Sequence, residues 1–144
     1  MVGLLVTGHG HFATGLGSSL QLIAGENPSI QYVDFEADHS TETLTANLNT
    51  AFDKMKDCDG VLVLADLAGG SPFKCAAECK FARPDQKIEV VAGTNLPMLI
   101  EASMSMPMYT DPDTMADAVT ASGKDFIIKF VLETHEDNAE EDGI

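Results

Sequence analysis

Basic residues are scarce in this chain. Eight lysines and arginines stand against 23 aspartates and glutamates, which gives a net charge of −15 at pH 7. A surface with this excess of negative charge repels phosphate-rich polymers and anionic membrane surfaces. We therefore expect no nucleic-acid partner.

Long apolar runs are absent as well. No run approaches the roughly 20 residues of a membrane span, and the opening MVGLLVTGHG lacks the basic segment and the apolar length of a signal peptide. We expect a cytoplasmic protein with no direct membrane insertion. Its 144 residues, 44% of them hydrophobic, suit one domain with a buried core.

Cysteine is rare, and its spacing does not suit zinc. Cys58, Cys75 and Cys79 are odd in number and lack the Cys-x2-Cys pattern. We expect reduced thiols, with Cys75 and Cys79 packed on one face of a helix rather than paired for metal or redox chemistry. No cofactor is expected.

Short apolar runs alternate with stretches of helical spacing. Strands are expected at 2–8, 30–35, 60–66 and 88–93, and helices at 12–25, 40–56 and 71–82. Near-continuous apolar strands separated by helices are typical of a parallel sheet covered on both faces. We predict an α/β fold, a three-layer sandwich with a mostly parallel sheet in the order 2-1-3-4.

The pattern changes after residue 93. Two further helices are expected at 95–105 and 111–123, and a last strand at 124–133. This strand is apolar but flanked by charge, which suits an antiparallel edge strand or one exchanged with a partner subunit across a hinge at Ser122-Gly123. The domain would span 1–133, and the acidic tail 134–144 would be disordered.

Candidate functional residues lie where the expected strands end. In open α/β sheets, ligands bind outside the carboxyl ends of the strands. The first strand ends at His9 and the third at Asp66, and the order 2-1-3-4 makes these strands neighbours. A carboxylate that accepts one imidazole N–H fixes the tautomer and leaves a lone pair on the other nitrogen, which can act as a nucleophile.

A phosphate site is expected beside this pair. Gly69, Gly70 and Ser71 place free backbone N–H groups at the start of a helix, with Ser71 as its cap and Pro72 in the first helical position. A nucleophilic imidazole next to an anion site suggests a phosphoryl group carried on histidine.

Other interpretations of these residues remain open. A histidine between glycines is more often structural than catalytic, and GGSP by itself is only a good helix start. His9 and His11 could instead bind a metal with Asp66 and His39, although no third ligand has motif spacing. Without a metal, His39 is expected to be a solvated surface residue.

Several runs together resemble a known family. The chain resembles the enzyme IIA domain of the mannose-type sugar phosphotransferase systems (PTS) in three longer runs, GLLVTGHGHFATGL, GVLVLADLAGGSPF and VVAGTNLPMLIEA. LIAGE and VDF, between the first two runs, are similar as well. The similarity spans roughly residues 1–130. Each motif alone is weak evidence for the family, but the combination of all of them rarely occurs by chance. The sequences TGHGHFATG and GTNLPML are most similar to those of family members that serve amino sugars such as N-acetylgalactosamine.

The resemblance implies a homodimer that exchanges its C-terminal strand. It also implies that the phosphocarrier protein HPr gives a phosphoryl group to His9, which passes it to the IIB component and so serves the membrane components IIC and IID. Asp66 would match the aspartate that orients the histidine, and Ser71 the serine beside the phosphoryl group. Because IIB is often joined through an Ala/Pro-rich linker and no such linker follows here, a free-standing subunit is expected.

Two alternatives come from other functional classes. The phosphotransferase subunit of a dihydroxyacetone kinase has the same fold and a phosphohistidine, but its first motif usually has His-Ser where this chain has His9-Gly10. A non-catalytic metal-binding or sensory module is the other.

Overall fold

A parallel sheet forms the middle of the molecule. The structure, a computed structural model, describes residues 1–133. Its strands are β1 (Val2–His9), β2 (Ile30–Phe35), β3 (Gly60–Ala65) and β4 (Ile88–Val91). All pairs are parallel and the order is β2-β1-β3-β4, as predicted.

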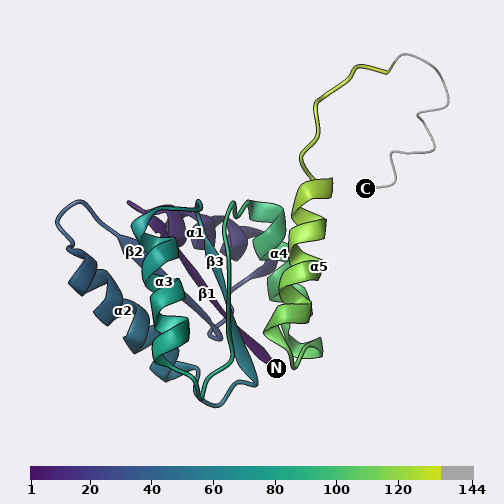
Figure 1. The fold of residues 1–144 in the computed structure, drawn as a ribbon. Coiled ribbons are helices and arrows are strands. Elements are labelled where there is room, and N and C mark those ends of the chain that lie inside the picture. Colours follow the sequence, from purple (N-terminus) through teal and green to yellow (C-terminus); the bar gives the residue numbers. More distant parts are fainter. Residues whose placement is uncertain (134–144) are drawn as a thin grey trace.

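Helices cover both faces of this sheet (Figure 1). One face carries α1 (Phe12–Ala24), α4 (Leu96–Ser105) and α5 (Pro112–Asp125), with a short 3-10 helix at Met106–Met108. The other carries α2 (Thr41–Lys54) and α3 (Ser71–Ala82). The predicted three-layer α/β architecture is therefore confirmed. Within residues 1–133, none of the helices combines the length and apolarity that a bilayer span requires.

The two central strands carry the core. β1 and β3 are buried along almost their whole length, and side chains of a strand alternate between the faces. Leu4 and Leu62 pack under α1, α4 and α5, whereas Leu5 and Val63 pack under α2 and α3. Cys75 and Cys79 are buried in this second cluster, as expected for packing residues.

The helices differ in how they begin. α2, α4 and α5 have side-chain caps from Ser40, Asn95 and Asp111. α1 and α3 begin after His11 and Gly70 without a side-chain cap from that residue. These two helices follow β1 and β3, where the candidate residues lie.

The chain beyond β4 departs from the sequence-based prediction. The hinge at Ser122-Gly123 is wrong, because both residues lie inside α5. Gly123 is where α5 crosses α4 closely: a Cβ there would lie 2.3 Å from Cγ of Met98, and the Gly123 carbonyl accepts a hydrogen bond from Asn95 Nδ2 at 3.1 Å.

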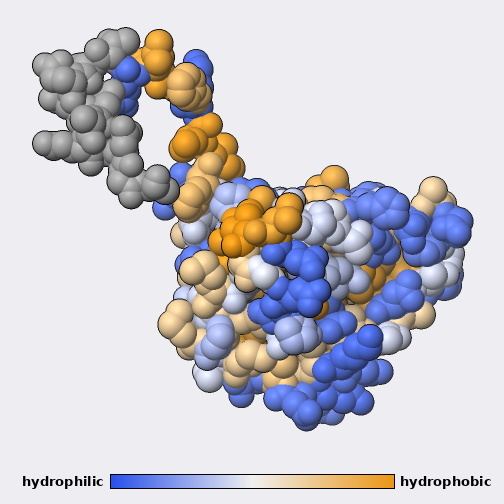
Figure 2. All heavy atoms as spheres, turned by 180° about the vertical axis from the view of Figure 1, so that it is seen from behind, coloured by the Kyte–Doolittle hydropathy of each residue, from blue (hydrophilic) through white to orange (hydrophobic). Residues whose placement is uncertain are grey.

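The expected strand at 124–133 is not formed in this single chain. Lys124 and Asp125 belong to α5, and residues 126–133 have no strand pairing. Figure 2 shows apolar side chains along this segment as it leaves the body of the protein. Six of them are more than half exposed: Phe126, Ile127, Ile128, Phe130, Val131 and Leu132. The tail at 134–144, which was expected to be disordered, lies outside the described residues.

Candidate active site

His9 and Asp66 meet at the carboxyl ends of β1 and β3, as the strand order predicts. Nδ1 of His9 lies 2.7 Å from Oδ2 of Asp66, and the same oxygen accepts the backbone N–H of His9 at 2.9 Å. The Asp66 side chain is 10% exposed and that of His9 is 48% exposed. The carboxylate is thus fixed inside the protein while the imidazole reaches solvent.

The hydrogen bonds at Asp66 define the protonation of the pair. Burial opposes ionisation of this carboxyl group, but hydrogen bonds from the backbone and ring of His9 and from the Leu67 N–H outweigh it, so the pKa of Asp66 lies below its ordinary value. An ionised carboxylate only accepts hydrogen bonds. Nδ1 of a neutral His9 ring therefore carries the proton, and Nε2 carries the lone pair.

The start of α3 lies against the His9 ring. A Cβ on Gly70 would be 2.7 Å from Cε1 of His9 and 3.4 Å from Nε2, so only glycine leaves room for this approach. Gly69 has φ +84° in the turn before it, a conformation that favours glycine. The backbone N–H groups at a helix start carry partial positive charge and bind anions.

The position of Ser71 corrects one detail of the prediction. Gly70 is the N-cap of α3, so Ser71 is the first helical residue and Pro72 the second. Gly70 adopts the extended backbone of a cap itself, with φ −85° and ψ 164°. The predicted bounds 71–82 are therefore confirmed, but the predicted Ser71 cap is wrong, because Ser71 already lies inside the helix.

Phe35 and Gly10 complete the surroundings of His9. The Phe35 ring, at the end of β2, meets the His9 ring edge-on with centroids 5.9 Å apart. Gly10 donates its N–H to the Phe35 carbonyl at 2.8 Å and has φ +58°. This turn directs the chain from β1 into α1 while leaving the imidazole uncovered.

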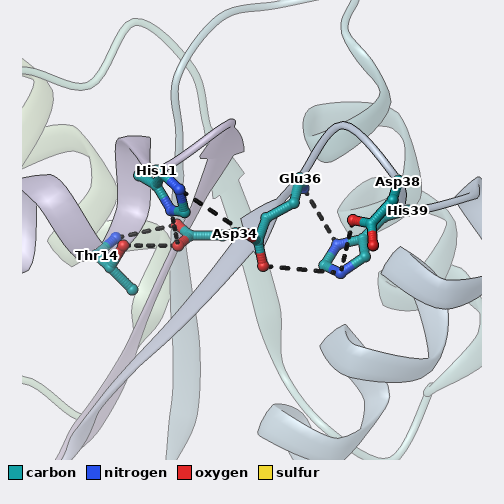
Figure 3. A network of polar contacts seen from close by, with 6 residues as sticks. All are labelled: His11, Thr14, Asp34, Glu36, Asp38 and His39. Carbon is teal, nitrogen blue, oxygen red and sulfur yellow. Dashed lines mark hydrogen bonds and ion pairs between the residues drawn. The ribbon is translucent and has the colours of Figure 1, made fainter.

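A second histidine and aspartate pair lies beside the first (Figure 3). Nδ1 of His11 is 3.3 Å from Oδ2 of Asp34. The Asp34 carboxylate also accepts the backbone N–H of Thr14 at 3.0 Å and its hydroxyl at 2.6 Å. Thr14 and burial act oppositely on Asp34: burial raises its pKa, the Thr14 and His11 contacts lower it, and the net direction is downward.

Asp34 is a site residue that was not predicted from the sequence. The signal was present, because Asp34 pairs in register with Gly8 on the neighbouring strand β1. Because β2 lies beside β1, Asp34 comes next to the turn after β1, where His11 lies.

The residues considered for a metal are held apart by separate partners. Asp66 contacts His9, Asp34 contacts His11, and His39 accepts the Glu36 backbone N–H on its own Nδ1 at 3.1 Å. His39 is only 22% exposed, so it stabilises a turn rather than standing free in solvent. Across residues 1–133, no group of three or more His, Cys, Asp or Glu side chains is arranged to hold a metal ion.

Comparison with known proteins shows the family. A family model described as the PTS system fructose IIA component, EIIA-man, matches residues 3–120. The chain belongs to this family. The resemblance noted in the sequence is thereby confirmed, and the family's members are components of sugar phosphotransferase systems.

Individual relatives agree with this assignment. The mannose-specific EIIAB component of Escherichia coli K12 is 32% identical over 120 residues, which are 83% of this chain and 35% of that protein. This chain thus spans about a third of that relative. The fructose-specific EIIA component of Bacillus subtilis 168 is 34% identical over 101 residues, 70% of this chain and 68% of that protein.

Solved structures show the same fold. The phosphotransferase system component EIIA from Streptococcus agalactiae is 35% identical and superimposes with a TM-score of 0.84. The match covers 90% of this chain and 98% of that one.

Proposed function

We propose that this protein is a phosphocarrier of a sugar phosphotransferase system, working in the cytoplasm between HPr and a IIB component. The observation that carries the proposal is the His9 ring, whose Nδ1 is bonded to Asp66 and whose Cε1–Nε2 edge lies beside the start of α3. Family membership supplies the chemical context.

The chemistry is a phosphoryl transfer between imidazoles. The lone pair on Nε2 of His9 forms a bond to the phosphorus of phospho-HPr. The P–N bond to the histidine of HPr breaks, and its electron pair returns to that ring. In the second transfer a nucleophile of IIB forms the bond to phosphorus, the P–N bond to His9 breaks, and its electron pair returns to the His9 ring. His9 thus acts as a covalent carrier.

Asp66 and the α3 start have different roles in this proposal. Asp66 keeps the proton on Nδ1 and holds the ring in place, which leaves Nε2 ready to attack. The N–H groups near Gly69 and Gly70 and the Ser71 hydroxyl bind the phosphoryl oxygens. Asp66 is kept away from these oxygens by the imidazole between them, which limits repulsion between the two anions.

The exposed C-terminal segment supports a dimer in which this segment is exchanged. It presents six apolar side chains to solvent in the single chain, and β4 is an edge strand of the sheet. An antiparallel strand from a second copy would pair with an open edge and cover this apolar surface.

The sugar served by the system, including the amino-sugar branch, stays a prediction from sequence.

The decisive test is phosphoryl labelling with phosphoenolpyruvate, enzyme I and HPr. Wild type and His11→Ala should be labelled, and His9→Ala should not. Label that persists in His9→Ala would refute the proposal. Transfer of the label to IIB, rather than to the bound nucleotide of a dihydroxyacetone kinase, separates the two phosphohistidine functions.

A further inference from the structure

The molecule presents two exposed histidines with similar local chemistry. In both His9 and His11, Nδ1 contacts an aspartate, so Nε2 of a neutral ring carries the lone pair. His11 is the more accessible, with 74% of its side chain exposed against 48% for His9. Because the tautomer is the same in both rings, accessibility alone would favour phosphorylation of His11.

The helix starts beside the two rings differ. His9 lies against the start of α3, where the N-cap residue Gly70 provides no side-chain cap. At the start of α1, beside His11, both oxygens of Asp34 are bonded to Thr14, one to its N–H and the other to its hydroxyl. The Thr14 N–H at the start of α1 is thus already bonded to a carboxylate and is not free for a phosphoryl group.

A second carboxylate lies at the reactive edge of His11. Oε1 of Glu36 is 3.8 Å from Nε2, the atom that would carry the phosphoryl group. Figure 3 shows Glu36 between His11 and His39. In the part of the chain that the structure describes, Asp66 is the only carboxylate within ion-pair distance of the His9 ring, and it lies on the Nδ1 side.

We propose that Asp34 and Glu36 are specificity-determining residues that keep the phosphoryl group off His11 and confine it to His9. Asp34 takes up the Thr14 N–H, so this donor at the start of α1 is not offered to a phosphoryl group on His11. Glu36 places negative charge where the phosphoryl oxygens would lie, and like charges at such distances repel even in a largely aqueous setting. The inference rests on the phosphocarrier function proposed above.

A small phosphoryl donor tests this without any partner protein. With phosphoramidate, Nε2 forms a bond to phosphorus, the P–N bond of the donor breaks, and ammonia leaves. Nuclear magnetic resonance of phosphorus and of the imidazole nitrogens identifies which histidine carries the group. In the full-length wild type, His9 should be labelled at least about tenfold faster than His11.

Variants in a His9→Ala background isolate the effect on His11. Glu36→Gln should raise the rate of His11 labelling about threefold to tenfold. Asp34→Asn should raise it also, because an asparagine whose oxygen accepts from Nδ1 turns its NH2 toward the Thr14 N–H and leaves that donor free. Asp38→Asn is the matched control, because Asp38 is 90% exposed and contacts His39 rather than His11. Circular dichroism checks that each variant is folded.

The outcomes separate this inference from the proposed function. Equal labelling of His9 and His11 in wild type would overturn it, as would a His11 rate that neither Glu36→Gln nor Asp34→Asn increases. Failure of phospho-HPr to label His9 would instead refute the phosphocarrier function, and the phosphoramidate ratio would still report on Asp34 and Glu36.

Discussion

The Cβ atom that Gly70 lacks would lie 2.7 Å from Cε1 of His9. The backbone at Gly70 is extended, with φ −85° and ψ 164°, so any residue could adopt it. Glycine is therefore required at this position for space rather than for conformation. The contact joins the imidazole directly to the first residues of α3.

Gly70→Ala should slow phosphoryl transfer to His9 about 10- to 100-fold, because the methyl group displaces the ring from the helix start. Loss of a good N-cap residue should also lower the free energy of unfolding by about 1 kcal/mol. Gly15→Ala is the matched control, since a Cβ there meets nothing within 4 Å. That variant should transfer normally, and rapid-quench labelling that gives the same rate for both would contradict the role of Gly70.

Asp66→Asn should slow transfer by about 10²-fold or more, by analogy with other carboxylate–histidine pairs. Asparagine can still accept a hydrogen bond, but it no longer fixes the proton on Nδ1 through charge. Imidazole nitrogen resonances should therefore show a changed tautomer population at His9. Asp117→Asn, on the exposed side of α5, should change neither measurement. Normal transfer by Asp66→Asn would rule out its positioning role.

Truncation before Ile127 should convert a dimer into a monomer or an aggregating protein. This deletion removes most of the exposed apolar segment but leaves α5, which ends at Asp125. Deletion from Thr134 onward should leave the dimer intact. Solution scattering at micromolar concentration gives the mass of each form, and a monomeric intact chain would contradict the proposed exchange.

Stability should fall in acid as Asp34 and Asp66 become protonated. Both carboxyl groups have a pKa below the ordinary 3.8, so each stabilises the folded state fully above that value and loses its contribution as pH falls through the lower, folded value. Urea unfolding followed between about pH 5 and pH 2 measures this loss. In the double variant Asp34→Asn/Asp66→Asn, the free energy of unfolding should depend less steeply on pH than in the wild type. The same slope in both proteins would count against a stabilising role for these two carboxylates.

The sequence was most informative where chemistry follows strand order. β1 and β3 have apolar runs that identify them as central strands, and their neighbouring ends place His9 beside Asp66. The same argument applied to β2 would have placed Asp34 next to the turn at His11. Within the run VDF, Asp34 has the position of an ordinary strand residue, and only its register against β1 brings it to the site.

Features that depend on packing between distant segments were not predictable in this way. Ser122-Gly123 has the composition of a hinge, yet Gly123 continues α5 because its small size lets the helix pack against Met98. Ser71 has good capping chemistry, but Gly70 already supplies the cap conformation. The segment 126–133 has strand composition without a strand partner among residues 1–133.

The bond from Asp34 to Thr14 also bears on how the chain folds. In α2, α4 and α5 the residue directly before the helix caps it, but α1 takes its carboxylate from a strand 20 residues further along. The first turn of α1 therefore lacks this stabilisation until β2 has docked beside β1, a closure that costs loop entropy. In refolding followed by hydrogen exchange, protection at Thr14 should appear together with that of β2 rather than with the remainder of its own helix.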